Sequence, residues 1–179
     1  NLTVVLPETV AREKLEKIKA LGVKTILHSN DSGVAEQHAQ KLAKEHGKIY
    51  VSPYNDPQII AGQGTLAIEL LDQLPRLDVV YVSIGGGGLI SGIGCVLKAF
   101  SPRTRVVGVS AKNSAELAAS IRAGKMVKVD HFETLADGCA GGVDNDTITL
   151  GLGSEVIDDL IDCSEGQIEV GLQLSLIHI

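Results

Sequence analysis

Residues 78–92 read Asp-Val-Val-Tyr-Val-Ser-Ile-Gly-Gly-Gly-Gly-Leu-Ile-Ser-Gly, and this stretch decides the fold class. The segment Asp78–Ile84 is almost continuously apolar, which is typical of a parallel strand covered on both faces. The four glycines Gly85–Gly88 then predict a sharp turn, and a helix is expected over Leu89–Phe100. A buried strand, a glycine turn and a helix in this order favour an α/β fold.

The glycine turn is also an expected anion site. A helix N-terminus leaves several backbone N–H groups unpaired and carries partial positive charge. Glycines let the backbone turn sharply and bring those N–H groups close to a phosphate. A turn that serves packing alone needs one or two glycines, so the four at Gly85–Gly88 favour a bound phosphate group.

The residues around the turn narrow the choice of phosphate ligand. A nucleotide-triphosphate loop would end in Gly-Lys-Ser or Gly-Lys-Thr, but Gly88 is followed by leucine and isoleucine. The dinucleotide fingerprint Gly-x-Gly-x-x-Gly/Ala fails from both Gly85 and Gly86. The next expected strand ends in Gly108-Val109-Ser110, with Lys112 just beyond, and has no acidic residue there. This disfavours NAD and leaves NADP as an alternative. A cofactor with a single phosphate fits better.

Before Pro53 the chain alternates strands with helices. Each expected helix ends near a glycine, Gly22 or Gly47, which suits the left-handed residue that often follows a helix. Because a helix separates consecutive strands, parallel pairing with right-handed crossovers is expected. The expected strands are Leu2–Leu6, Lys24–His28 and Ile49–Ser52.

The segment Pro53-Tyr-Asn-Asp-Pro57 breaks the composition and is a candidate domain crossing. Asp56 is expected to cap a helix that begins at Pro57. We expect Gly62–Thr65 to interrupt that helix, which resumes over Leu66–Leu74.

Two later segments have the form of a capping box, in which an N-cap side chain and a side chain three residues on satisfy each other's backbone N–H groups. They are Asn113–Glu116, before a helix that ends at Gly124, and Ser164–Gln167. The remaining expected elements are strands Arg105–Val109 and Leu160–Cys163, a glycine-rich loop Leu135–Gly142 and a helix from about Thr147.

Composition excludes several classes of protein. The 179 residues include 16 Lys and Arg against 22 Asp and Glu, without a basic patch, which argues against a binder of nucleic acid or of anionic membranes. No apolar run approaches the roughly 20 residues that span a bilayer. Three widely spread cysteines, Cys95, Cys139 and Cys163, suit reduced thiols in the cytoplasm. Neither the cysteines nor the five histidines have metal-ligand spacing, so no metal is expected.

Four segments in order carry a resemblance to a known family: Pro53–Pro57, Ile60–Thr65, Ser83–Gly92 and Thr134–Gly138. They resemble the serine/threonine dehydratase and serine racemase group of fold-type II pyridoxal-phosphate enzymes, from Asn1 to about Gly171. The resemblance implies two open parallel sheets with helices on both faces, as in the tryptophan synthase β subunit. It makes 1–52 part of a small mobile domain and 53–173 the second half of the large cofactor-binding domain.

The resemblance also implies a cofactor and a reaction. The phosphate of pyridoxal 5′-phosphate would be held by the glycine turn and the residue after it, that is by Gly85, Gly86, Gly87, Gly88 and Leu89. The parent enzyme would be an ammonia-lyase that converts a small hydroxy amino acid to a 2-oxo acid and ammonia, and it would form a homo-oligomer. Alternatives are a racemase of the same family, an NADP-binding oxidoreductase, and a non-catalytic effector-binding protein.

The resemblance finally indicates what this stretch of sequence lacks. The family's Schiff-base lysine stands in a Ser-Phe-Lys-type segment, and none of the eleven lysines here does. We therefore expect an internal fragment that is inactive alone, contains no catalytic residue and ends in a non-native tail at 174–179. Relatives with a divalent-cation site place a glutamate where Ser110 stands here, and Glu116 reads more simply as a capping-box residue, so a metal is doubtful.

Overall fold

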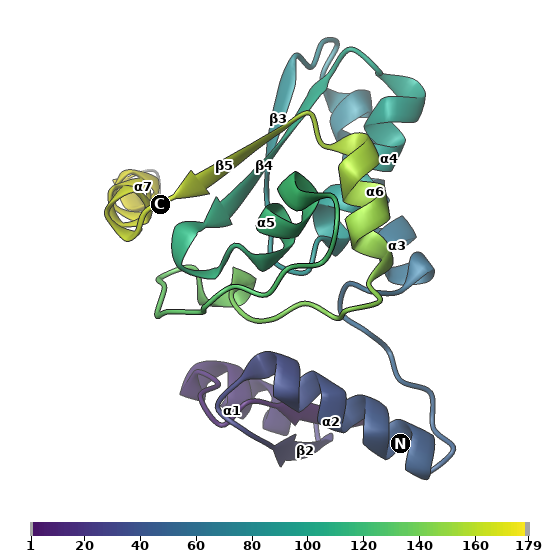
Figure 1. Cartoon of the computed structure of the whole chain (residues 1–179), viewed down its shortest axis with the longest axis vertical. Coiled ribbons are helices and arrows are strands. Elements are labelled where there is room, and N and C mark those ends of the chain that lie inside the picture. The colour runs from purple at the N-terminus through teal and green to yellow at the C-terminus, as the bar shows by residue number, and fades with distance from the viewer. Residues whose placement is uncertain (1, 178–179) are drawn as a thin grey trace. The chain divides into compact units, whose positions relative to one another are not determined.

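The computed structural model describes residues 2–177 (Figure 1). The chain divides into two compact units, Asn1–Ser52 and Pro53–Ile179. The division falls at the composition break before Pro53. That the two units are parts of a mobile domain and of a cofactor-binding domain stays a prediction.

The first unit contains a two-stranded parallel sheet. Strand β1 (Thr3–Leu6) pairs with β2 (Lys24–Leu27), with Thr3 opposite Lys24. Helix α1 (Arg12–Ala20) follows β1 and helix α2 (Ser32–Glu45) follows β2. Gly22 and Gly47 lie just beyond the two helices with φ of +70° and +58°, which confirms the predicted glycine stops.

The prediction of a third strand in this unit, at Ile49–Ser52, is wrong. These residues form neither strand nor helix, and Ile49 and Val51 are 92% and 62% exposed. A strand needs a neighbouring backbone to pair with its N–H and C=O groups. Within residues 2–177, β1 and β2 pair only with each other, so apolar alternation alone does not make this segment a strand.

The second unit contains a three-stranded parallel sheet in the order β3-β4-β5 (Figure 1). Val79 lies opposite Arg105, and Val107 lies opposite Asp159. The strands are β3 (Val79–Ser83), β4 (Arg105–Ala111) and β5 (Asp159–Cys163). Two parallel sheets interleaved with helices confirm the predicted α/β fold class.

Five α-helices belong to this unit, among the residues described. Helix α3 packs against α4, and α6 packs against both α4 and α5 (Figure 1). They are α3 (Pro57–Gln73), α4 (Gly88–Phe100), α5 (Glu116–Ala123), α6 (Ile148–Val156) and α7 (Glu165–Ile177). None of the helices within residues 2–177 is long and apolar enough to cross a membrane.

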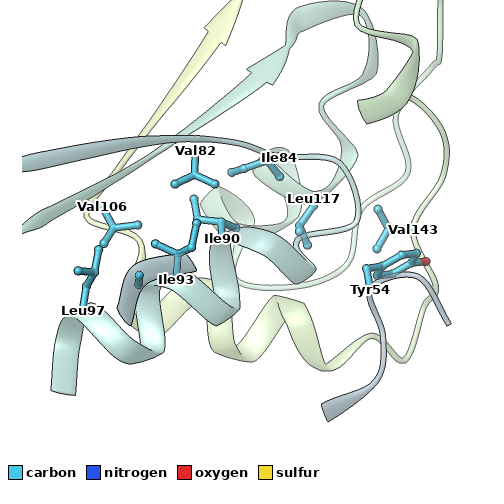
Figure 2. Close-up of a cluster of buried hydrophobic side chains, with 10 residues drawn as sticks. Tyr54, Val82, Ile84, Ile90, Ile93, Leu97, Val106, Leu117 and Val143 are labelled. Carbon is cyan, nitrogen blue, oxygen red and sulfur yellow. The ribbon is translucent and has the colours of Figure 1, made fainter. Parts of the chain in front are cut away.

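The core of the second unit forms where α4 meets the sheet. Ile90, Ile93 and Leu97 recur at the spacing of one helix face, and all three are buried. Figure 2 shows them beside side chains of β3 and β4, with a second group around Tyr54. The other labelled members of the cluster are Val82, Ile84, Val106, Leu117 and Val143.

Helix α3 begins as predicted but is not interrupted. Asp56 Oδ1 accepts the N–H groups of Gln58 at 2.7 Å and Ile59 at 3.1 Å, which confirms the cap. The predicted break at 62–65 is wrong, because α3 runs from Pro57 to Gln73 without interruption and Gly64 serves helix packing. A Cβ on Gly64 would lie 3.1 Å from the carbonyl oxygen of Gly92 in α4, so glycine is what allows the two helices to lie this close.

Strand β3 is covered less completely than predicted. Val82 and Ile84 are buried, but Tyr81 is 64% exposed, so one side of the strand faces solvent in this chain. The capping box at the start of α7 is confirmed, since Ser164 N–H donates to Gln167 Oε1 at 2.9 Å and Gln167 N–H to Ser164 Oγ at 3.4 Å. Of the expected tail 174–179, residues 174–177 continue α7, and 178 and 179 lie outside the described residues.

Candidate functional site: a glycine turn at the start of helix α4

The glycine turn joins the carboxyl end of β3 to the N-terminus of α4. Ile84 N–H donates to the carbonyl of Val109 at 2.8 Å, which holds the last residue before the turn against β4. Gly87 is the N-cap of α4 with φ of +85°, a left-handed conformation that glycine adopts at no steric cost. As a glycine, Gly87 has no side chain with which to cap this N-terminus. An anion could therefore accept its backbone N–H groups.

Tyr54 forms one wall of the turn. A Cβ on Gly86 would overlap with Cγ and Cδ1 of the Tyr54 ring, and a Cβ on Gly88 would lie 2.9 Å from Tyr54 Cα. Real Cβ atoms do not approach other heavy atoms this closely, so both positions require glycine while Tyr54 stays in place. The two glycines thus let the main chain of the turn lie directly against Tyr54, with no side chain between them.

The other walls come from distant parts of the unit. A Cβ on Gly85 would lie 3.0 Å from the carbonyl oxygen of Cys139. A Cβ on Gly87 would overlap with Leu117 Cδ2 and lie 3.0 Å from Thr149 Cβ. A side chain at Gly85 or Gly87 would therefore meet neighbouring atoms, and Gly87 also has a backbone conformation that favours glycine.

Thr149 binds a backbone carbonyl of the turn. Its hydroxyl donates to the Gly86 carbonyl at 2.8 Å, and its Oγ1 lies 2.7 Å from Thr147 Oγ1. Thr147 is the N-cap of α6, so the start of α6 is joined to the turn by side-chain hydrogen bonds. Because the carbonyl is satisfied by a protein donor, an anion would meet the amide side of the turn.

Tyr54 and Asn55 are held by residues just before and at the start of α6. Asp144 N–H donates to the Tyr54 hydroxyl at 2.9 Å. Ile148 N–H donates to Asn55 Oδ1 at 3.0 Å, and Asn55 Nδ2 donates to Asp144 Oδ2 at 3.3 Å. Figure 2 shows Tyr54 next to Val143, the residue before Asp144. These bonds fix the wall on which Gly86 and Gly88 pack.

Glu116 is a buried carboxylate close to this site. Only 2% of it is exposed, and its oxygens bind Lys128 Nζ at 3.0 Å, the N–H of Val143 at 3.1 Å and His131 Nε2 at 3.0 Å. Burial by itself would raise the pKa of Glu116, but the donors from Lys128, Val143 and His131 outweigh it, and the pKa lies below its ordinary value. The carboxylate is therefore ionised at neutral pH.

The predicted capping box at Asn113–Glu116 is wrong. Ala115 is the N-cap of α5 without a side-chain cap, and Glu116 is the first residue of the helix. The carboxylate binds groups from other segments instead of its own N-cap backbone. Ser110, considered above for an NADP phosphate, is 1% exposed and so has no access to a ligand in solution.

Comparison with known proteins identifies the family of this chain. Residues 1–175 match the family described as pyridoxal-phosphate dependent enzyme. The chain belongs to this family. The match confirms the resemblance inferred from the sequence.

Three relatives of this pyridoxal-phosphate-dependent family illustrate the similarity. The L-threonine ammonia-lyase of Thermotoga maritima is 37% identical over 166 residues, which are 93% of this chain and 41% of that protein. The structure of processed threonine deaminase isoform 2 from Solanum lycopersicum matches with a TM-score of 0.79 and 32% identity, over 90% of this chain and 47% of that one. Maize serine racemase matches with a TM-score of 0.82 and 30% identity, over 92% and 49%.

The chain spans less than half the length of each of these family members. Their activities therefore belong to longer proteins, and what the whole protein does here is a matter for proposal.

The structure brings the five predicted cofactor-binding residues, Gly85 to Leu89, together at the start of α4. That they hold the cofactor stays a prediction. Sequence reasoning missed the residues that surround the turn. The signal was present for Tyr54, which lies in the Pro53–Pro57 segment, although that segment was interpreted as a domain crossing. Nothing in the sequence pattern singled out the remaining walls, Leu117, Cys139 and Thr149.

Proposed function

We propose that the turn formed by Gly85, Gly86, Gly87, Gly88 and Leu89 holds the phosphate of pyridoxal 5′-phosphate. The observation that carries the proposal is the N-terminus of α4, which has no side-chain cap at Gly87 and is entered through glycines that pack against Tyr54, Cys139, Leu117 and Thr149. Unpaired N–H groups and the positive end of the helix dipole favour an anion there. The absence of a lysine after Gly88 suits a single phosphate better than a triphosphate.

We further propose that the parent protein is an ammonia-lyase that converts a small hydroxy amino acid to a 2-oxo acid and ammonia. The similarity to the threonine ammonia-lyase and the threonine deaminase supports this proposal. Bound pyridoxal phosphate supplies an electron sink that stabilises negative charge on the substrate's α-carbon. The part of this chain is to anchor and orient the cofactor by its phosphate.

A racemase is the second candidate, because maize serine racemase is among the similar structures. An assay of the longer protein that contains this chain separates the two. With L-threonine or L-serine as substrate, formation of 2-oxo acid and ammonia supports the lyase. Formation of D-serine without 2-oxo acid would replace it with the racemase.

Four further proposals concern the parent protein and this chain alone. The parent forms a homo-oligomer. It acts in the cytoplasm, in keeping with three cysteines that form no disulfide within the described residues. Residues 1–52 belong to its mobile domain and 53–173 to its cofactor-binding domain. The chain alone is inactive, because none of its lysines stands in the segment that carries the family's reactive amine.

Phosphate binding is tested on the 179-residue chain itself. Pyridoxine 5′-phosphate is the probe, because it lacks the aldehyde that would react with surface lysines, and pyridoxine without phosphate is the control ligand. Isothermal calorimetry gives the affinity, and backbone amide shifts map where the ligand binds. We expect pyridoxine 5′-phosphate to change the backbone amide chemical shifts of residues 85–89, and pyridoxine to leave them unchanged. Inorganic phosphate should compete with pyridoxine 5′-phosphate for this site.

Two glycine variants localise the site. In Gly86→Ala the added methyl overlaps the Tyr54 ring, so the turn must move and the affinity should fall by about tenfold or more, which corresponds to about 1.4 kcal/mol. In Gly62→Ala the methyl meets no atom within 4 Å, so the affinity should not change. Equal affinities in the two variants, with both shown to be folded by circular dichroism, would remove the turn as the binding site.

A further inference from the structure

Ser114, Glu116 and His131 form a chain of hydrogen bonds beside the glycine turn. Gly141 N–H donates to Ser114 Oγ at 3.0 Å, and Ser114 Oγ lies 2.8 Å from His131 Nδ1. His131 Nε2 lies 3.0 Å from Glu116 Oε2. We call Ser114, Glu116 and His131 the relay.

The chemistry of the two ends fixes the direction of every bond in the relay. The Gly141 N–H can only donate, so Ser114 Oγ is its acceptor. The ionised Glu116 carboxylate can only accept, so His131 Nε2 carries a hydrogen. A neutral His131 then accepts at Nδ1, and the Ser114 hydroxyl donates to it.

The alternative protonation leaves one group unsatisfied. If His131 were an imidazolium, its Nδ1–H would donate to Ser114 Oγ, which already accepts from Gly141. The Ser114 hydroxyl hydrogen would then have no acceptor among residues 2–177, although Ser114 is buried. A buried donor without a partner is costly. The neutral Nε2–H tautomer satisfies every group in the relay.

The relay holds the segment that walls the glycine turn. Ser114 binds the N–H of Gly141, and Glu116 binds the N–H of Val143. Two backbone groups of one short loop are therefore attached to residues at and just before the start of α5. The same loop begins at Cys139, whose main chain fills the space beside Gly85. A displacement of the loop would therefore open the wall at Gly85.

We propose that Ser114, Glu116 and His131, with His131 as the neutral Nε2–H tautomer, are positioning residues that hold 139–143 against the glycine turn. The effect of this positioning on ligand affinity rests on the proposed phosphate role of the turn. The effect on the backbone order of residues 85–89 does not depend on that role, because it is measured without ligand.

The chain offers a matched control for Glu116. Asp158 is also a carboxylate that accepts a backbone N–H, from Val106 at 2.7 Å, and pairs with a lysine, Lys98, at 2.6 Å. Burial by itself would raise the pKa of Asp158, but the hydrogen bonds from Lys98 and Val106 outweigh it. The pKa of Asp158 therefore lies below its ordinary value, as that of Glu116 does. Asp158 binds β4 and α4 at their far ends from the turn, so Asp158→Asn removes a comparable charge without touching the loop.

The first measurement compares backbone order without ligand in Glu116→Gln and Asp158→Asn. We expect the ¹⁵N order parameters of residues 85–89 to fall from about 0.85 toward about 0.6 in Glu116→Gln and to stay rigid in Asp158→Asn. The same change in both variants, or in neither, overturns the proposal. Ser114→Ala removes only the hydroxyl, and it gives the same readout if Glu116→Gln does not fold.

Two more readouts separate positioning from general support. The ¹⁵N shifts of His131 at neutral pH should report Nε2–H, and a signal for Nδ1–H or imidazolium overturns the bond order of the relay. The affinity for pyridoxine 5′-phosphate should fall about tenfold or more in Glu116→Gln and be unchanged in Asp158→Asn. If the wild-type chain binds no pyridoxine 5′-phosphate, the proposed function fails, while the order parameters still decide the positioning role.

Discussion

Replacing Gly87 with alanine tests whether the turn is shaped by its surroundings as well as by its own backbone. Gly87 has φ of +85°, and an added Cβ would overlap with Leu117 Cδ2 and lie 3.0 Å from Thr149 Cβ. Gly124 has φ of +66°, and its Cβ would meet nothing within 4 Å. Gly124→Ala is therefore a control for backbone strain without crowding, in the same structural unit.

The magnitude follows from the two contributions. A left-handed conformation costs an L-residue about 1–2 kcal/mol, and this cost applies to both variants. Overpacking a buried site costs a further 1–3 kcal/mol or so, and this cost applies to Gly87→Ala alone. The change in the unfolded chain is common to both, so it cancels in the difference. We expect Gly87→Ala to be less stable than Gly124→Ala by roughly 1–3 kcal/mol.

Urea unfolding followed by circular dichroism measures this difference, because the chain contains no tryptophan to report by fluorescence. With a slope of about 2 kcal/mol per molar urea, the midpoints should differ by about 0.5–1.5 M. Equal midpoints would refute the reasoning, because they would mean that Leu117 and Thr149 move aside without cost and do not shape the turn.

Four further outcomes are expected. Asp56→Ala removes the cap of α3 and should cost about 1 kcal/mol in urea unfolding, and no loss would mean that the cap contributes nothing. Gly62→Ala, inside the same helix with open space around it, should raise stability by about 0.5–1 kcal/mol in the same assay, and a loss would contradict an open helical site. Because the folded-state pKa of Glu116 lies below its ordinary value of 4.5, its contribution is complete above that pH and is lost as pH falls through the folded pKa. Unfolding measured between about pH 3 and 6 should thus be less pH-dependent in Glu116→Gln, and parallel curves would contradict this. Burial and then the Glu155 charge raise the pKa of Cys95, so its alkylation at neutral pH should be slower than that of a free cysteine peptide, and an equal rate would count against it.

Features that depend on neighbouring residues could be predicted from the sequence. The Asp56 cap, the glycine after each of several helices and the Ser164–Gln167 capping box all express local backbone preferences and local hydrogen bonds. The turn itself was visible because strand, glycines and helix are contiguous in the chain. Local signals of this kind survive folding, since no distant contact is needed to satisfy them.

Features that depend on distant contacts could not be predicted in the same way. The glycines of 62–65 suggest a helix break, but Gly64 lies inside the continuous helix α3. A glycine there leaves space for the close approach of Gly92 in α4. Glu116 stands in a capping-box pattern, yet its carboxylate binds Lys128 and His131 across the fold. Local hydrogen bonds were outcompeted here by partners that become neighbours only in the folded chain.

The site shows the same division between local and distant information. Gly85–Leu89 could be chosen from the sequence because an anion-binding turn is made of consecutive residues. Tyr54, Cys139 and Thr149 lie 31 to 60 or so residues away from the turn along the chain, and no periodicity relates them to it. Their role follows only from the packing of the second unit.

The separation of these walls has a consequence for the order in which the chain folds. Tyr54 lies at the start of the second unit and Thr149 follows Gly86 by 63 residues, and both must close on the turn before its shape is complete. Closing such long stretches of chain is slow relative to forming a helix or a tight turn. The turn should therefore acquire its final geometry in the last stage of folding. A ligand bound there would slow global unfolding of the unit. An isolated peptide of residues 83–92, which contains the glycines but none of the walls, would not bind the ligand.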